Sequence, residues 1–164
     1  MAETVFLGIG SNLGDRKSFL DFAVRNLEDI LSEIRVSRVY ETDPMYVREQ
    51  EPFLNAVVRG ETTAGPAELL DMIQDIEKKA GRNREGAVRR GPRVLDIDIL
   101  LYGDRRIETP RLVCPHPLIR ERLFVLVPLL EIAPDCTEPG TGIHYRDYMS
   151  ALDGSEYGIR PLES

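Results

Sequence analysis

GPRVLDIDILLY, residues 91–102, is an apolar segment with two aspartates, Asp96 and Asp98, near its centre. Apolar residues alternate with these acids at a spacing of two, which is typical of a strand with one buried face. Both carboxylates then lie together on the other face. Ionised carboxylates in apolar surroundings are costly unless a proton, a cation or a metal ion compensates them. The segment therefore predicts a central strand that carries a site for positive charge.

The residues before this strand predict five further elements. Strands are expected where β-branched and aromatic residues cluster, and helices where apolar residues recur every three or four positions. The predicted elements are strand 4–10, helix 19–34, strand 35–42, strand 53–63 and helix 66–80. With the Asp96/Asp98 strand the order is β-α-β-β-α-β, the split β-α-β pattern of an α+β fold with helices packed on an antiparallel sheet. Beyond Gly103 we expect one helix over 118–130 and irregular structure from 133 onward.

The bulk properties limit the class of protein. With 164 residues, we expect a single domain over residues 1–164, and 42% hydrophobic and 30% charged residues are typical of a soluble globular protein. The longest apolar stretch, 123–133, is too short to span a membrane. Cys114 and Cys136 lack the spacing of a metal or redox site, so reduced thiols and a cytoplasmic location are expected. The formal net charge of −7 argues against a nucleic acid or a membrane surface as the partner.

A basic loop, residues 82–93, leads directly into the aspartate strand. From Lys78 to Arg93 there are seven cations and one acid, so this window carries +6 and the rest of the chain −13. Arginines bind phosphate oxygens in bidentate geometry, and Mg²⁺ prefers carboxylate and phosphate oxygens. Acids that hold a metal beside arginines that hold phosphate indicate a nucleotide site. The alternatives are a solvated basic loop and aspartates with a structural role only.

Two smaller groups are candidates for binding. His116 lies close in sequence to Arg120 and Arg122 and could donate to a phosphate, although a histidine beside prolines is more often a structural loop residue. Phe53 and Asn55 share one face of their strand. A ring and an amide in this arrangement could stack on a flat heterocycle and hydrogen-bond its edge, although Phe53 could equally belong to the core.

Taken together, these residues resemble the 6-hydroxymethyl-7,8-dihydropterin pyrophosphokinases of folate biosynthesis. The segments that carry the resemblance, which covers roughly residues 4–150, are GIGSNLGD (8–15), FLNAVV (53–58), Gln74 with Glu77, GRNR…RRGPRVLDIDILLYG (81–103) and PHPLIRERLFVLVPLLEIAPD (115–135). The resemblance implies a ferredoxin-like fold and a transferase that moves a pyrophosphoryl group from ATP to the hydroxymethyl group of a reduced pterin, leaving AMP. Such a reaction needs no protein nucleophile, because the protein mainly positions the reactants and neutralises charge.

The resemblance also implies roles for individual residues. Two Mg²⁺ ions would be held by Asp96 and Asp98, which form the catalytic group with Arg82 and Arg93. ATP would be bound by Gln74, Glu77, Arg84, Ile99, Arg111, His116 and Arg122. The pterin would be bound by Thr42, Pro44, Phe53, Asn55 and Phe124. The chain departs from the family pattern at Phe53, Arg90, Val113 and Pro117, and its basic loop is one residue longer. We therefore expect differences in how the loop closes rather than in the reaction.

Three hypotheses follow. The first is the pyrophosphokinase. The second is a ferredoxin-like binding module for RNA or a small regulator, which the negative charge and the lack of aromatic RNA-binding strands oppose. The third is another Mg²⁺-dependent nucleotidyl or phosphoryl transferase that uses the same aspartates. Only small-molecule partners are expected, with no nucleic acid and no membrane, and the protein is expected to be a monomer or a weak homodimer.

Overall fold

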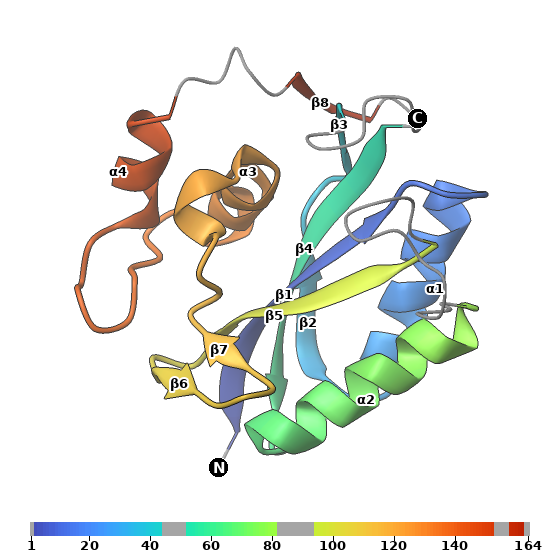
Figure 1. Cartoon of the computed structure of the whole chain (residues 1–164), viewed down its shortest axis with the longest axis horizontal. Coiled ribbons are helices and arrows are strands. Elements are labelled where there is room, and N and C mark those ends of the chain that lie inside the picture. The colour runs from blue at the N-terminus through green and yellow to red at the C-terminus, as the bar shows by residue number, and fades with distance from the viewer. Residues whose placement is uncertain (1, 44–51, 82–93, 153–157, 163–164) are drawn as a thin grey trace.

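The computed structural model describes residues 2–43, 52–81, 94–152 and 158–162, and one antiparallel sheet forms its centre (Figure 1). The strand order is β5-β1-β4-β3-β8, and β2 pairs with β4 alone. The strands of this sheet are β1 (Glu3–Ser11), β2 (Ser32–Val36), β3 (Tyr40–Thr42), β4 (Phe53–Thr62), β5 (Asp96–Tyr102) and β8 (Ile159–Pro161). The other elements are α1 (Arg16–Glu28), α2 (Pro66–Lys79), the hairpin β6 (Ile107–Glu108) and β7 (Val113–Cys114), the 3₁₀ turn η1 (Ile119–Glu121), α3 (Leu123–Ile132) and α4 (Tyr145–Ser150).

Helices cover both faces of the sheet (Figure 1). On one face, α1 and α2 pack over Val5, Leu7 and Ile9 of β1 and form the main core. On the other face, α3 and α4 lie over a second core that includes Val57 and Leu100. Successive strand residues point to opposite faces, so each strand contributes to both cores. The chain order is β1-α1-β2-β3-β4-α2-β5, in which β2 and β3 take the place of one predicted strand. This order and the antiparallel pairing confirm the predicted ferredoxin-like α+β fold.

The first helix ends earlier than the sequence predicts. It begins after Asp15, whose carboxylate accepts the backbone N–H of Ser18 at 3.2 Å, and it ends at Glu28. The prediction of helix through residue 34 was therefore wrong. Leu31 continues the helical spacing of apolar residues, but it reaches the main core from the turn after the helix. Likewise, the predicted strand 35–42 is two short strands, β2 and β3, that both pair with β4.

The second helix and the strand after it agree with the sequence prediction. Pro66 is the first residue of α2, where its fixed backbone angle suits a helix start. Leu69, Ile73 and Ile76 form the predicted buried stripe. The helix is followed by Gly81, which has a positive φ of 92°. These residues position α2 against the strand that carries the aspartates.

The C-terminal third is more regular than predicted. The expected helix 118–130 is found as η1 followed by α3, but the expectation of irregular structure from residue 133 was wrong, because α4 and β8 form there. Both are too short to leave a periodic pattern, and β8 obtains its hydrogen bonds from β3. Arg160 of β8 also pairs with Glu41 and Asp43 at 2.5 and 3.4 Å. No helix in the described ranges is long and apolar enough to cross a membrane.

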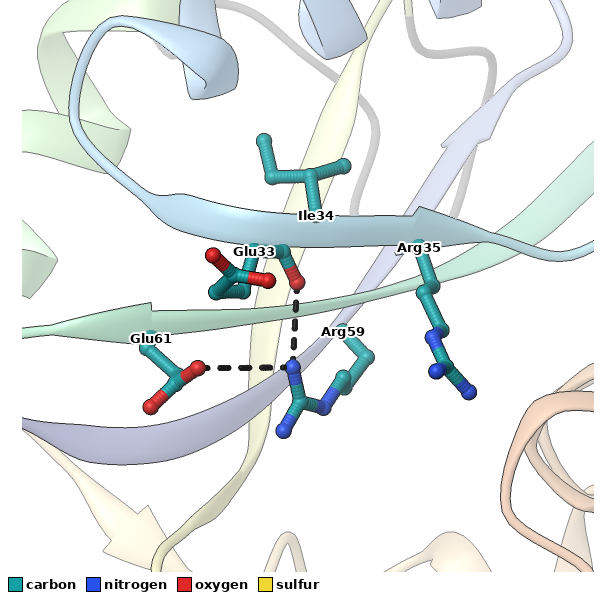
Figure 2. Close-up of a pocket in the computed structure, with 5 residues that line it drawn as sticks. All are labelled: Glu33, Ile34, Arg35, Arg59 and Glu61. Carbon is teal, nitrogen blue, oxygen red and sulfur yellow. Dashed lines mark hydrogen bonds and ion pairs between the residues drawn. The ribbon is translucent and has the colours of Figure 1, made fainter.

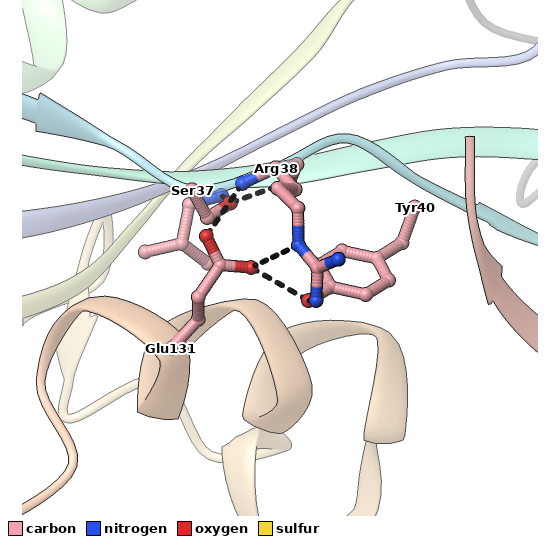
Figure 3. Close-up of polar contacts among 5 residues, drawn as sticks. Ser37, Arg38, Tyr40 and Glu131 are labelled. Atoms are coloured by element: carbon pink, nitrogen blue, oxygen red, sulfur yellow. Dashed lines mark hydrogen bonds and ion pairs between the residues drawn. The ribbon is translucent and has the colours of Figure 1, made fainter. Parts of the chain in front are cut away.

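A carboxylate near the end of α3 fastens this helix to the sheet (Figure 3). Glu131 accepts hydrogen bonds from the Tyr40 hydroxyl at 2.6 Å and from the backbone N–H of Arg38 at 2.8 Å. The Arg38 guanidinium donates to the same carboxylate at 3.4 Å. Because Tyr40 belongs to β3, these contacts fix α3 relative to the outer strands of the sheet.

Candidate active site

The two aspartates of β5 lie on the face of the sheet opposite α1 and α2. Ile97 and Ile99, which alternate with them, are buried in the main core, whereas Asp96 and Asp98 are half-buried. In the register with β1, Asp96 lies opposite Gly10 and Asp98 opposite Gly8. The strand therefore keeps the acids out of the main core, as the alternation in the sequence predicts.

Glycines leave bare backbone beside the two carboxylates. Gly10 is paired with Asp96 on one side and with Asn55 of β4 on the other, so the three residues form one row across the sheet. A Cβ atom at Gly10 would lie 2.8 Å from the Asn55 side-chain oxygen, and one at Gly8 would touch Leu100. Glycine within a strand often marks a close approach of a ligand or of another chain segment. The row thus forms a floor with a carboxylate at one end and an amide at the other.

Asn55 and Thr42 are held together at the far end of this floor. The Asn55 amide nitrogen donates to the Thr42 hydroxyl at 2.6 Å, and both side chains are buried. This bond orients the amide so that its oxygen lies toward Gly10. Phe53 is half-buried on β4 two residues before Asn55, on the same face, and pairs with Thr42. The structure brings these three predicted pterin-binding residues together.

His116 is near the carboxylate end of the floor. Burial and the positive charge of Arg122 together lower the pKa of His116 to about 4, although the negative charge of Asp96 acts in the opposite direction. The ring is therefore neutral near pH 7. Its Nδ1 atom accepts the backbone N–H of Leu118 at 3.2 Å, which assigns the ring proton to Nε2. His116, Arg122 and Asp96 thus interact electrostatically, and the Nε2–H of His116 is the ring donor that can bind a ligand.

Phe124 follows this group at the start of α3. Its ring packs against the second core, and the Arg122 guanidinium carbon lies 5.4 Å from the ring centroid. A cation over an aromatic face is attracted by the ring quadrupole. The contact therefore links a predicted ATP-binding residue to a predicted pterin-binding residue.

The other predicted ATP-binding residues lie at α2 and β5. The Arg111 guanidinium donates to the Gln74 side chain at 3.5 Å and to Asp71 at 2.6 Å. The Glu77 side chain is buried and accepts the backbone N–H of Ile97 at 2.9 Å, directly between the two aspartates in sequence. Ile99 is buried in the main core. Asp71 was not predicted from the sequence, although it lies one helical turn before Gln74.

Four predicted site residues, Pro44, Arg82, Arg84 and Arg93, lie outside the described residues, as does Arg90. Within the described ranges, no cluster of three or more His, Cys, Asp or Glu side chains that could hold a metal ion is found. Asp96 and Asp98 are a pair of oxygen donors two residues apart, which suits Mg²⁺ because this ion keeps water and phosphate oxygens in its shell. The donor set therefore fits a magnesium ion that phosphates help to hold.

Two hollows lie beside the sheet. One, of about 350 Å³, is lined by the segment from Val113 to Pro117, which includes His116, and by Arg120 and Glu138. The other, of about 340 Å³, lies between β2 and β4, where Arg59 donates to the Glu33 carbonyl at 3.0 Å (Figure 2). Only the first contains a predicted site residue.

The comparisons with known proteins identify the family of the chain. The family described as 7,8-dihydro-6-hydroxymethylpterin-pyrophosphokinase matches residues 6–134. The 2-amino-4-hydroxy-6-hydroxymethyldihydropteridine pyrophosphokinase of Bacillus subtilis is 44% identical over 86% of this chain and 84% of that protein. The enzyme of the same name from Methylorubrum extorquens is 44% identical over 96% of this chain and 98% of that protein.

A solved structure shows the same fold. The wild-type HPPK-DHPS of Plasmodium falciparum, crystallised with pteroate, aligns with a TM-score of 0.72 at 16% identity over 92% of this chain. This chain covers only 42% of that longer protein. The match of the family over most of the chain decides between the three hypotheses drawn from the sequence. The chain belongs to the 7,8-dihydro-6-hydroxymethylpterin-pyrophosphokinase family, as the resemblance in its sequence predicts.

Proposed function

We propose that this protein transfers the pyrophosphoryl group of ATP to the hydroxymethyl group of 6-hydroxymethyl-7,8-dihydropterin, with AMP as the other product, in folate biosynthesis. The observation that carries the proposal is the row Asp96–Gly10–Asn55 across the sheet. It sets a carboxylate and an amide at the two ends of a row whose middle residue, Gly10, has no side chain. A flat heterocycle on that floor would have its hydrogen-bonding edge at Asn55 and its hydroxymethyl group toward the acids.

The pterin is held by residues of the sheet and of α3. Asn55, oriented by Thr42, recognises the polar edge of the ring, and Phe53 with Phe124 supplies aromatic surface. A buried amide with a fixed partner discriminates well, because a ligand without the matching groups would leave it unsatisfied. Pro44 belongs to this group by the family resemblance.

ATP is held on the other side of the acids. His116, through the proton on Nε2, and Arg122 would bind phosphate oxygens. By the family resemblance, Gln74, Glu77, Ile99 and Arg111 belong to the nucleotide side, where Arg111 donates to Gln74. Arg82, Arg84 and Arg93 complete the phosphate contacts by resemblance. Asp96 and Asp98 would hold two Mg²⁺ ions, which neutralise the triphosphate and polarise the phosphorus that is attacked. The residues of the chain otherwise position the pterin oxygen in line with the β-phosphate of ATP and exclude water.

Product analysis is the test of this function. Incubated with ATP, Mg²⁺ and 6-hydroxymethyl-7,8-dihydropterin, the protein is expected to form AMP and the pterin diphosphate in equal amounts, measured by ion-exchange chromatography. Removal of Mg²⁺ with a chelator should stop the reaction, and added Mg²⁺ should restore it. Formation of ADP in place of AMP would contradict the proposed transfer.

We further propose a single domain that works as a monomer or a weak homodimer in the cytoplasm, with small molecules as its only partners. One polypeptide supplies residues for both substrates. Asn55, Thr42 and Asp96 lie on strands of one sheet, whereas Gln74 and Glu77 lie in α2, which packs on the opposite face from Asp96. Sedimentation at several protein concentrations would measure the oligomeric state.

A further inference from the structure

Glu138 is a buried carboxylate that the proposed function does not use. Its side chain is only 6% exposed, and it lies beyond the residues that match the family, 6–134. Buried carboxylates are rare unless they are paired and hydrogen-bonded, so the contacts of Glu138 indicate what it is for.

Both oxygens of Glu138 are engaged by side chains of other segments. The Arg120 guanidinium donates to them in bidentate geometry at 2.8 and 3.1 Å. The hydroxyls of Thr141 and Tyr148 donate to the same carboxylate at 2.7 and 2.9 Å. Arg120 also lies over the Tyr148 ring, 4.9 Å from its centroid. The Arg120 guanidinium is therefore held by a bidentate ion pair with Glu138 and by stacking on the Tyr148 ring.

The loop that carries Glu138 is itself fixed. The backbone N–H of Glu138 donates to the Ile143 carbonyl at 2.8 Å, and its carbonyl accepts the N–H of Gly142 at 2.9 Å. A bridge between Thr137 and His144 closes the loop below these bonds. Glu138 is thus presented from a closed hairpin, and its position does not depend on Arg120.

Arg120 connects this anchor to the ATP side of the active site. It lies in η1, within the short segment that runs from His116 to Arg122. In that segment the Ile119 N–H donates to the His116 carbonyl and the Arg122 N–H to the Ile119 carbonyl, both at 3.3 Å. The Leu118 N–H sets the His116 ring, as described above. A fixed Arg120 therefore fixes the backbone that presents the two proposed phosphate-binding side chains.

The pterin side has separate supports. Asn55 and Thr42 are placed by the pairing of β3 with β4 and by their own hydrogen bond. None of the contacts given above for Glu138 and Arg120 reaches these strands. The pterin side is reached from this segment only through the stacking of Arg122 on Phe124, among the contacts given above. Loss of Glu138 should consequently weaken ATP binding more than pterin binding.

We propose that Glu138 is a positioning residue for ATP, which acts through Arg120 to hold His116 and Arg122 in the geometry that binds phosphate. The inference rests on the proposed function for the identity of the nucleotide. The proposal gives the hairpin between Thr137 and His144 a role in ATP binding, although no site residue was predicted there.

The test compares Glu138→Gln with a matched control in the same region. Asp135→Asn removes the carboxylate of an exposed ion pair with Arg146, at 3.6 Å, and should behave as wild type. For Glu138→Gln, the dissociation constant of a nonhydrolysable ATP analogue with Mg²⁺, measured by calorimetry, should rise about tenfold, the factor that corresponds to one charge-assisted hydrogen bond. The KM for the pterin at saturating ATP should stay within about twofold of wild type, since Asn55 and Thr42 are held by contacts of their own.

The outcomes separate positioning from general stability. Unchanged affinity for the analogue, or equal losses for analogue and pterin, would overturn the proposal. Arg120→Lys keeps the charge but not the bidentate geometry, and it replaces the glutamine variant if that variant does not fold. It should weaken analogue binding relative to Asp135→Asn, and an affinity equal to that of this control would also overturn the proposal. Because analogue binding is measured without turnover, Glu138 is tested even if the wild-type protein makes no AMP, a result that would count against the proposed function alone.

Discussion

At the scale of single residues, Gly8 and Gly10 shape the site as much as the aspartates do. Asp96 and Asp98 are only half-buried, and the residues opposite them in the register are glycines, which add no side chain on the face of the acids. The sequence alone showed the alternation of Asp96 and Asp98 with isoleucines. It did not show that two glycines of a distant strand lie opposite them, because the register between two strands cannot be predicted from the sequence of either strand alone.

The first prediction concerns the aspartates. Asp96→Asn and Asp98→Asn should each lower kcat by about 100-fold or more, as the loss of a group that stabilises the transition state does. The fold should persist, because amide and carboxylate have the same shape. Steady-state kinetics and thermal unfolding measure the two effects. Asp104→Asn, an exposed aspartate just after β5, is the control; near-normal turnover in either site variant would contradict the metal assignment.

A second prediction concerns the floor of the site. Gly10→Ala places a methyl group 2.8 Å from the Asn55 amide oxygen, so the amide must move. We expect a loss of about 1–3 kcal/mol in the free energy of unfolding, as for overpacked cores, and a raised KM for the pterin. Chemical denaturation and kinetics measure these. Gly65→Ala is the matched control, because nothing lies within 4 Å of a Cβ there. An unchanged pterin KM for Gly10→Ala would speak against a ligand on this floor.

At the scale of elements, the sequence predicted the helices and strands that are long enough to carry a local pattern of apolar residues and end signals. Helix α2 agrees with its prediction because proline, an apolar stripe and glycine mark its start, buried face and end. The end of α1 was missed, since Leu31 keeps the helical spacing although it lies in a turn. The short elements α4 and β8 were missed as well, because tertiary contacts rather than local propensity form them.

The third prediction concerns the attachment of α3 through Glu131 (Figure 3). Burial raises the pKa of this carboxyl, but hydrogen bonds from Tyr40 and Arg38 outweigh burial and leave the pKa below its ordinary value. A group of this kind stabilises the fold above its unfolded pKa and loses that effect as the pH falls through the folded pKa. Glu131→Gln should therefore lose about 1–2 kcal/mol at pH 7, and this deficit should shrink as the pH falls below the ordinary glutamate pKa of about 4.3 and through the lower folded pKa.

Denaturation in urea at several pH values measures this difference. Glu108→Gln is the control, since that carboxylate is exposed and lies 4.0 Å from Arg106. Its stability should follow that of the wild type at every pH. A Glu131→Gln variant with the same deficit at low and neutral pH would show that the charge of Glu131 has no part in holding α3.

At the scale of the whole molecule, the site joins segments far apart in the chain. Thr42 and Asn55 come from adjacent strands, whereas His116 and Arg122 arrive from beyond the last strand of the β-α-β-β-α-β unit. The sequence motifs and the family resemblance predicted which residues belong to the proposed site. The distances between these residues, and the support that Glu138 gives to Arg120, depend on tertiary packing and could not be predicted from any one segment.

A fourth prediction follows from the two unequal cores. The main core is formed by two helices of thirteen and fourteen residues, whereas α4 on the other face has only six. Regions with few buried contacts open at lower free energy than the rest of a fold. Amide hydrogen exchange, followed by mass spectrometry, should be faster in α3 and α4 than in α1 and β4. Equal protection on both faces would indicate that the layers open only together.

The bare strip at Gly8 and Gly10 also bears on inhibition. A planar compound that rests on peptide groups takes little of its affinity from side chains there, so a substitution that would dislodge it must add bulk. At position 10 any added carbon collides with Asn55, which is also a residue of the proposed pterin site. Resistance to such a drug should therefore arise at the rim of the pocket and rarely in its base.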